Sequence, residues 1–240
     1  MGVKVVGINA SPRKYGNTFK LLKVAMEAAS RIAETEIIHL YDYDIKPCKG
    51  CLSDDQSLCH PPCLEEDDAW EVLKKVKEAE GLIIATPIYW YGPPGHLKNL
   101  IDKMTVFENM AILEGRSWVE GKPAGFIVAG GDSGAIMTIG YLMVTLNSMG
   151  FAMPPWALAF YEGMDDALNY GERVLDAANV GRVVSLMASY RPEKDLWFDP
   201  ELLKKLGDAD LLKRIREEAR RNRELLLPTR RELSEKMGKK

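Results

Sequence analysis

Short apolar runs alternate with amphipathic helical segments along the first 190 residues, and this alternation constrains the fold more than any other feature. The apolar runs typical of β-strands are residues 4–9, 36–40, 81–86, 122–130 and 151–159. The segments with apolar residues at helical spacing are residues 19–33, 67–78, 94–107, 134–149 and 171–188. Strands that alternate with helices in this way form a parallel sheet with helices on both faces.

The number of strands favours one arrangement of that sheet. Five strands fit the flavodoxin-like order 2-1-3-4-5, so we predict a three-layer α/β sandwich. Ligands of such sheets bind outside the carboxyl ends of the strands, where the strand order reverses. The loops after the first, third and fourth strands are therefore expected to converge on one site.

The loop after the first strand has the composition of a phosphate site. Its candidate binding residues are Ser11, Arg13, Gly16, Asn17 and Thr18. They stand at the start of a helix, whose free N–H groups and dipole attract an anion. The loop contains neither GxxxxGK[ST] nor GxGxxG, and its hydroxyls and single arginine suit one terminal phosphate, such as that of FMN. The alternative is an ordinary strand-to-helix connection in which Ser and Asn act as caps.

The other two loops combine aromatic residues with glycines. After the third strand come Pro87, Ile88, Tyr89, Trp90, Tyr91 and Gly92. Adjacent aromatic side chains in a loop either stack on a flat ligand or pack against a neighbouring subunit. After the fourth strand come Gly131, Asp132 and Ser133, where the backbone N–H groups can approach the edge of a ring. Flavin chemistry requires no side-chain acid or base, so we assign no catalytic residue.

All four cysteines of the chain lie between the second strand and the next helix. They are Cys48, Cys51, Cys59 and Cys63, with the spacing C-x2-C-x7-C-x3-C. Thiolates this close in sequence are good ligands for zinc or an iron–sulfur cluster. Two alternatives are disulfides or redox-active thiols, and reduced thiols that only shape a loop.

Charge and hydropathy limit the partners and the cellular location that can be expected for this chain. The formal net charge is −3, which gives no overall basic character for binding nucleic acid. No signal peptide or membrane-spanning run is recognisable, so we expect a cytoplasmic protein with neither nucleic acid nor membrane as a partner. Residues 191–240 are rich in charge, with leucines at helical spacing. They predict a helical arm packed on the domain of residues 1–190 or on a partner subunit.

Two separated motifs carry a family resemblance. GINASPR with GNT at residues 7–18, and TPIYW at residues 86–90 running into residues 97–103, resemble the NADPH-dependent FMN reductase family over residues 3–160. The resemblance implies that Ser11, Arg13, Asn17 and Thr18 bind the FMN phosphate. It also implies that Pro87, Ile88, Tyr89, Trp90 and Gly92 flank the isoalloxazine ring, with the glycine-rich loop on its other side. Dimers or pairs of dimers, with the flavin near the interface, are expected.

The cysteine segment, taken as an insertion at residues 46–66, resembles the corresponding part of iron–sulfur flavoproteins. Asp54 stands where the third cysteine of that family occurs. The two resemblances together imply an FMN-dependent oxidoreductase that moves electrons from NAD(P)H or a protein donor to an unidentified acceptor. A [4Fe–4S] cluster on the four cysteines is one of the open alternatives. The alternative function is an FMN electron carrier or redox sensor that turns over no small substrate. For either function, the expected assembly is a homodimer or homotetramer.

Overall fold

The computed structural model describes residues 2–190 and scattered positions near the C-terminus. Those positions are residues 213, 216, 217, 220–222, 224, 228, 232, 235, 237 and 238, all helical and exposed. The chain divides into two units, Met1–Trp197 and Phe198–Lys240. Most of the predicted arm at residues 191–240 lies outside the described residues, so its packing stays a prediction.

A five-stranded parallel sheet forms the centre of the first unit. The strands are β1 (Lys4–Asn9), β2 (Glu34–His39), β3 (Gly81–Pro87), β4 (Ala124–Gly130) and β5 (Leu158–Glu162). Their order is β2-β1-β3-β4-β5, and every neighbouring pair is parallel. The predicted flavodoxin-like order 2-1-3-4-5 is therefore confirmed.

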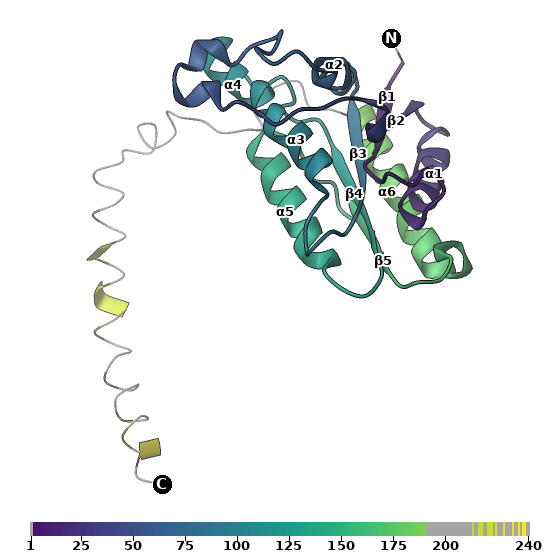
Figure 1. Cartoon of the computed structure of the whole chain (residues 1–240). Helices are drawn as coiled ribbons and strands as arrows, with labels where there is room; N and C mark the ends of the chain where they lie inside the picture. Colours follow the sequence, from purple (N-terminus) through teal and green to yellow (C-terminus); the bar gives the residue numbers. More distant parts are fainter. Residues whose placement is uncertain are drawn as a thin grey trace. The chain divides into compact units, whose positions relative to one another are not determined.

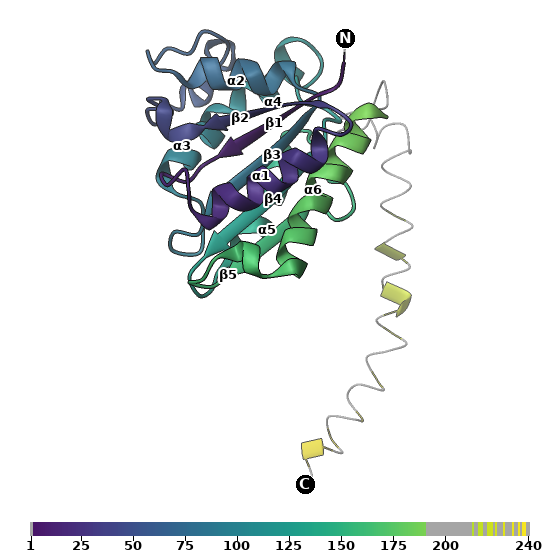
Figure 2. The same ribbon diagram turned by 90° about the vertical axis from the view of Figure 1, so that its right-hand side faces the viewer.

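Helices cover both faces of the sheet (Figures 1 and 2). One face carries α1 (Asn17–Ala29) and α6 (Gly171–Ser189), which lie side by side in Figure 2. The other carries α2 (Ala69–Glu78), α3 (Gly95–Lys103), α4 (Thr105–Leu113) and α5 (Ala135–Ser148). Val5 belongs to the core under α1 and α6, whereas Val6 and Ile8 belong to the core on the opposite face. Burial on both faces explains why the central strands β3 and β4 are almost continuously apolar in sequence.

The contact between α1 and α6 depends on a glycine. A Cβ atom at Gly181 of α6 would overlap the carbonyl group of Ala25 in α1. The two helix backbones can approach this closely only because Gly181 has no side chain.

Two predicted elements were wrong in their bounds. The predicted strand 151–159 starts only at Leu158, because Pro154 and Pro155 lack N–H groups and Trp156 has φ +60°. The predicted helix 94–107 is two helices, α3 and α4, which meet at Met104. Met104 is the C-cap of α3 and the N-cap of α4, and its ψ of −12° departs from the usual helical value of about −42°.

The segment between β2 and α2 contains the cysteines in short 3₁₀ turns. These are η2 (Cys51–Ser53) and η3 (Gln56–Leu58), and all four cysteines are free thiols. Among the described residues, no helix combines the length and the apolar character needed to cross a membrane.

Candidate functional site

The loops at the carboxyl ends of the strands meet at one edge of the sheet. The N–H of Ala10 donates to the carbonyl oxygen of Ala85 at 2.8 Å, which joins the loop after β1 to β3. The N–H of Ile88 donates to Ala129 at 3.0 Å, joining the loop after β3 to β4. The N–H of Gly163 donates to Gly130 at 2.9 Å. The predicted convergence of three loops is present, and the loop after β5 also joins them, which the sequence did not indicate.

The start of α1 has the features of an anion site. Ser11 and Thr18 are each only 4% exposed, and the Ser11 hydroxyl accepts the N–H of Arg13 at 3.2 Å. No side chain caps the first turn of α1, and that turn contains no acidic residue. Its N–H groups therefore remain available to an anion, and a phosphate monoester would fit them.

The side chain of Asn17 is engaged elsewhere. Its Nδ2 donates to the carbonyl oxygen of Asp165 at 2.7 Å, and its Oδ1 accepts the N–H of Ala167 at 3.1 Å. Lys20 strengthens the same connection through an ion pair of 2.7 Å with Asp166. Asn17 thus fixes the loop after β5 beside α1, and its backbone N–H is the group it can offer to a phosphate.

The aromatic loop forms a tight hairpin of two residues. Tyr89 and Gly92 exchange two backbone hydrogen bonds, at 2.9 and 3.2 Å, around Trp90 (φ +51°) and Tyr91 (φ +64°). Such turns ordinarily contain Asn-Gly, because other side chains are strained at positive φ. Trp90 is 95% exposed. Strain of about 1–3 kcal/mol per residue is found mainly at functional sites.

The glycine-rich loop after β4 packs directly against the aromatic loop after β3. A Cβ at Gly130 would come within 2.5 Å of the Ile88 side chain, and one at Gly134 (φ +101°) would come within 3.0 Å of the Tyr91 ring. The exposed residues Gly131, Asp132 and Ser133 follow this contact. At the start of α5, a carboxylate oxygen of Glu162 accepts the N–H of Ala135 at 2.9 Å. This acid disfavours an anion at α5, whereas α1 has no such acid in its first turn.

An aromatic and histidine cluster borders the same edge. His96 Nε2 lies 3.0 Å from the carbonyl oxygen of Leu40 and 3.1 Å from that of Tyr43, so this nitrogen carries the hydrogen. The His96 ring packs on Tyr41 at 4.7 Å between centroids. Burial, with a smaller effect of Tyr89, raises the pKa of Tyr41. His96 therefore joins α3 to the segment after β2.

The four cysteines line a single cavity of about 40 Å³ together with Trp70 and Lys103. Asn109 of α4 holds the cysteine segment, because its Nδ2 donates to the carbonyl oxygens of Gln56 and Cys59, both at 2.9 Å. Burial, aided by the other three thiols, raises the pKa of Cys59 to about 11.

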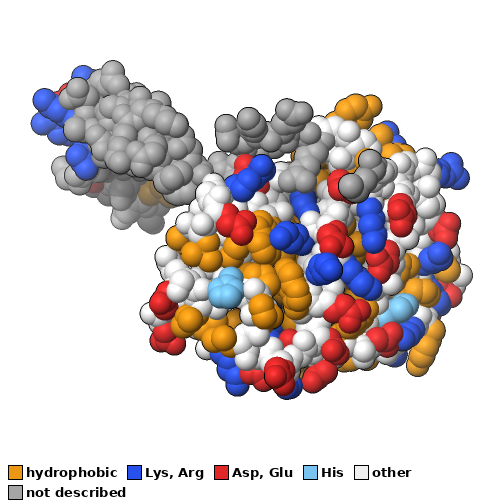
Figure 3. All heavy atoms as spheres, turned by 90° about the horizontal axis from the view of Figure 1, so that it is seen from above, with side chains coloured by type: hydrophobic (Ala, Val, Ile, Leu, Met, Phe, Trp, Pro, Cys, Tyr) orange, Lys and Arg blue, Asp and Glu red, His pale blue; other side chains and the backbone are white. Residues whose placement is uncertain are grey.

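The surface of one face combines apolar and charged regions. Figure 3, which views the molecule from above, shows hydrophobic side chains gathered in one area beside interspersed basic and acidic ones.

The donor set of this cavity is of the kind that binds a soft metal or an iron–sulfur cluster, because four cysteines line it. Within the described part of the chain, however, no three His, Cys, Asp or Glu side chains are gathered in a metal-binding arrangement. Cys48 and Cys63 are exposed. Binding would require the exposed ends of the segment to close around the group.

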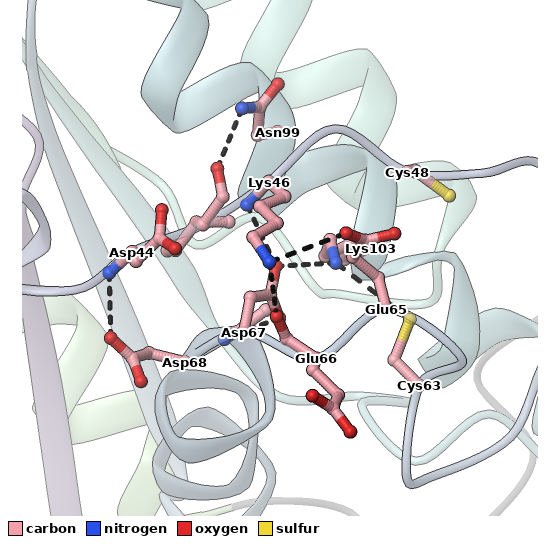
Figure 4. Close-up of polar contacts among 12 residues, drawn as sticks. Asp44, Lys46, Cys48, Cys63, Glu65, Glu66, Asp67, Asp68, Asn99 and Lys103 are labelled. Carbon is pink, nitrogen blue, oxygen red and sulfur yellow. Dashed lines mark hydrogen bonds and ion pairs between the residues drawn. The ribbon is translucent and has the colours of Figure 1, made fainter.

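Sequence reasoning missed two residues beside these thiols. Lys103 and Asp67 form a buried ion pair at the cavity (Figure 4). They lie far apart in sequence, and a lysine at the end of an amphipathic helix is ordinarily exposed. Nothing in the local sequence pattern marks this pair.

Known proteins resemble this chain in sequence. An iron–sulfur flavoprotein from Archaeoglobus fulgidus is 43% identical over 102 residues, which are 42% of this chain and 48% of that protein. Iron–sulfur flavoprotein MJ1083 from Methanocaldococcus jannaschii is 43% identical over 104 residues, 42% of this chain and 51% of the relative. The chain thus spans about half the length of these two relatives. Another Archaeoglobus fulgidus iron–sulfur flavoprotein is 31% identical over 160 residues, 66% of this chain and 69% of its own length.

Solved structures share the fold. RosB, with a bound 8-demethyl-8-formylriboflavin-5'-phosphate intermediate, superposes with a TM-score of 0.67 at 19% identity, over 90% of this chain and 87% of RosB. NAD(P)H:quinone oxidoreductase from Methanothermobacter marburgensis superposes with a TM-score of 0.58 at 20% identity, over 76% of this chain and 98% of that one.

The family assignment rests on sequence over most of the folded part. The sequence model of the NADPH-dependent FMN reductases matches residues 3–164, which include the strands, the three predicted loops and the cysteine segment. This chain belongs to the NADPH-dependent FMN reductase family.

Proposed function

We propose that this protein is an FMN-dependent oxidoreductase that takes electrons from NAD(P)H, or from a protein donor, and delivers them to a second acceptor. Family membership supports FMN as the flavin. The observation that carries the proposal is the uncapped start of α1, with the buried hydroxyls of Ser11 and Thr18 beside it. Bound FMN would supply the electron-transfer chemistry, and the protein would bind and orient it.

The proposed contacts follow the loops. Ser11, Arg13, Gly16 and Thr18, with the N–H of Asn17, would hold the phosphate. The residues proposed to flank the ring are Pro87, Ile88, Tyr89, Trp90 and Gly92, together with the backbone of Gly131, Asp132 and Ser133. The hydrogen bonds between these loops would hold the ring in one orientation.

The second candidate is an electron carrier or redox sensor with no small substrate. Four thiols around one cavity favour it, because a metal site there could exchange single electrons with a partner. We propose Cys48, Cys51, Cys59 and Cys63 as the ligands of that site. The three relatives described above are all named iron–sulfur flavoproteins, which supports the same proposal.

We also propose that the chain forms homodimers or homotetramers. Residues 135–148 of α5 contain no charged side chain. Ile136, Met137 and Val144 are each more than 60% exposed within the described unit. An uncharged, partly apolar helix face of this kind is typical of a subunit interface.

An ultraviolet–visible spectrum of protein purified without oxygen tests the function first. We expect flavin absorbance that bleaches on addition of NADH or NADPH. Reduction by dithionite but not by either nicotinamide would support the carrier instead. A colourless protein that takes up no added FMN would contradict both candidates.

A further inference from the structure

The ion pair between Lys103 and Asp67 is deeply buried. Lys103 Nζ lies 2.7 Å from Asp67 Oδ2, and the two side chains are 2% and 1% exposed (Figure 4). Removing two charges from water is costly, and apolar side chains of similar size often stabilise a protein more. Stability alone therefore does not account for this pair.

The carboxylate is fixed in place by the backbone around it. Asp67 accepts the N–H of Lys46 at 2.8 Å and the N–H of Ala69 at 3.1 Å. Burial acts to raise the pKa of Asp67, but the hydrogen bonds from Lys103, Lys46 and Ala69 outweigh it and lower that pKa. Asp67 is thus an ionised anchor at the start of α2.

The ammonium that Asp67 anchors faces the cysteine cavity. Lys103 Nζ lies 3.9 Å from Cys63 Sγ, and Lys103 lines the same cavity as all four cysteines. The neighbouring lysines are engaged on the outside: Lys46 and Lys49 pair with Glu65 at 3.6 and 3.0 Å. An ammonium has three donor hydrogens, so Lys103 can bind Asp67 and a sulfur at once.

A fixed positive charge has a defined effect on a metal held by thiolates. Hydrogen bonds to the ligand sulfurs and nearby charge set the reduction potential of iron–sulfur groups. A nearby cation stabilises the reduced state of such a group, because that state carries one more negative charge than the oxidised state. The cation therefore raises the reduction potential.

We propose that Lys103 is a positioning residue of the cysteine cavity: anchored by Asp67, it donates to Cys63 Sγ and raises the reduction potential of an iron–sulfur group held by the four cysteines. This inference rests on the metal-binding role proposed above for the four cysteines. The relatives are named for an iron–sulfur group, whereas the roles of Lys103 and Asp67 come from the geometry of this chain.

The test uses the full chain, loaded with FMN and treated without oxygen with ferrous iron and sulfide. Iron content and midpoint potential are measured for the wild type, Lys103→Met and Asp67→Asn. We expect the potential to shift to more negative values in Lys103→Met and to more positive values in Asp67→Asn, where the ammonium loses its counter-charge. The matched control is Lys4→Met, which removes an ion pair of 2.8 Å with Glu36 in another part of the fold and should leave the potential unchanged.

Opposite shifts separate this role from a structural one, which would lower iron content in both variants alike. Equal potentials in Lys103→Met and the wild type, or a wild type that binds no iron, would overturn the inference. If Lys103→Met does not fold, Lys103→Met/Asp67→Asn removes both buried charges, and because Lys103 is the member of the pair that contacts Cys63 Sγ, its potential must still lie below that of the wild type. Flavin absorbance of the same samples keeps the proposals apart: FMN without iron contradicts this inference and the metal-binding role of the cysteines but leaves the proposed FMN-dependent oxidoreductase standing, whereas absent FMN contradicts the oxidoreductase.

Discussion

Ser11 and Arg13 differ in burial, and this difference determines which side chain contributes more free energy to phosphate binding. Ser11 is buried in the loop before α1, whereas Arg13 is exposed to solvent. A hydrogen bond to a charged group contributes about 1.5–3 kcal/mol when buried, whereas an exposed ion pair contributes about 0–1 kcal/mol. Ser11→Ala should weaken FMN binding by roughly 10- to 100-fold, and Arg13→Gln by less.

Fluorescence titration of the FMN-free protein measures both affinities. Ser30→Ala serves as the control, because its hydroxyl caps the far end of α1 by donating to the carbonyl oxygen of Glu27. If Ser11→Ala and the wild type bind FMN with equal affinity, the loop is an ordinary strand-to-helix connection and not a phosphate site.

His39 gives the fold a dependence on pH. Burial, aided by the charge of Lys14, lowers the pKa of His39 below its ordinary value, although Asp42 opposes the shift. The unfolded chain then binds the proton more readily, so this contribution to stability is complete above about pH 6.5 and is lost as the pH falls. The free energy of unfolding should decline on acidification more steeply in the wild type than in His39→Gln. Denaturant titrations at several pH values measure the difference, and parallel pH profiles would contradict the expected role.

At the scale of elements, the hairpin of Trp90 and Tyr91 places two strained residues at the ligand edge. Replacing them by Asn-Gly, the pair preferred in such turns, should raise the free energy of unfolding by about 1 kcal/mol or more. The same change should weaken FMN binding if the aromatic side chains contact the flavin. Trp156→Gly is the matched control: it relieves a similar strain at φ +60° before β5, at the other edge of the sheet. Thermal unfolding and FMN titration measure the two effects, and unchanged FMN affinity in the Asn-Gly variant would exclude a role in flavin binding.

Elements that depend on local pattern were predictable, and contacts between distant residues were not. The bounds of β1 are those predicted, because every residue from Val5 onward is buried and residues 5–8 contain no polar side chain. The start of β5 was misplaced, because apolar residues continue through Pro154 and Pro155, which cannot enter the hydrogen-bond ladder. The meeting of the loops after β1, β3 and β4 at one edge was predictable from the alternation of strands and helices. The pairing of Lys103 with Asp67, and the engagement of Asn17 by Asp165 and Ala167, arise only from tertiary contact.

At the scale of the whole molecule, α5 is where a second copy would be expected to bind. Val144 is 69% exposed and lies towards the end of α5 that is distant from the loop after β4. A carboxylate there costs little in a free subunit but would be desolvated at an apolar interface. Val144→Glu should therefore lower the mass of the assembly in light scattering, whereas Ser30→Glu, which adds the same charge beside α1, should not. If Val144→Glu keeps the wild-type mass and FMN content, α5 is not the interface, and its apolar face must be covered in another way.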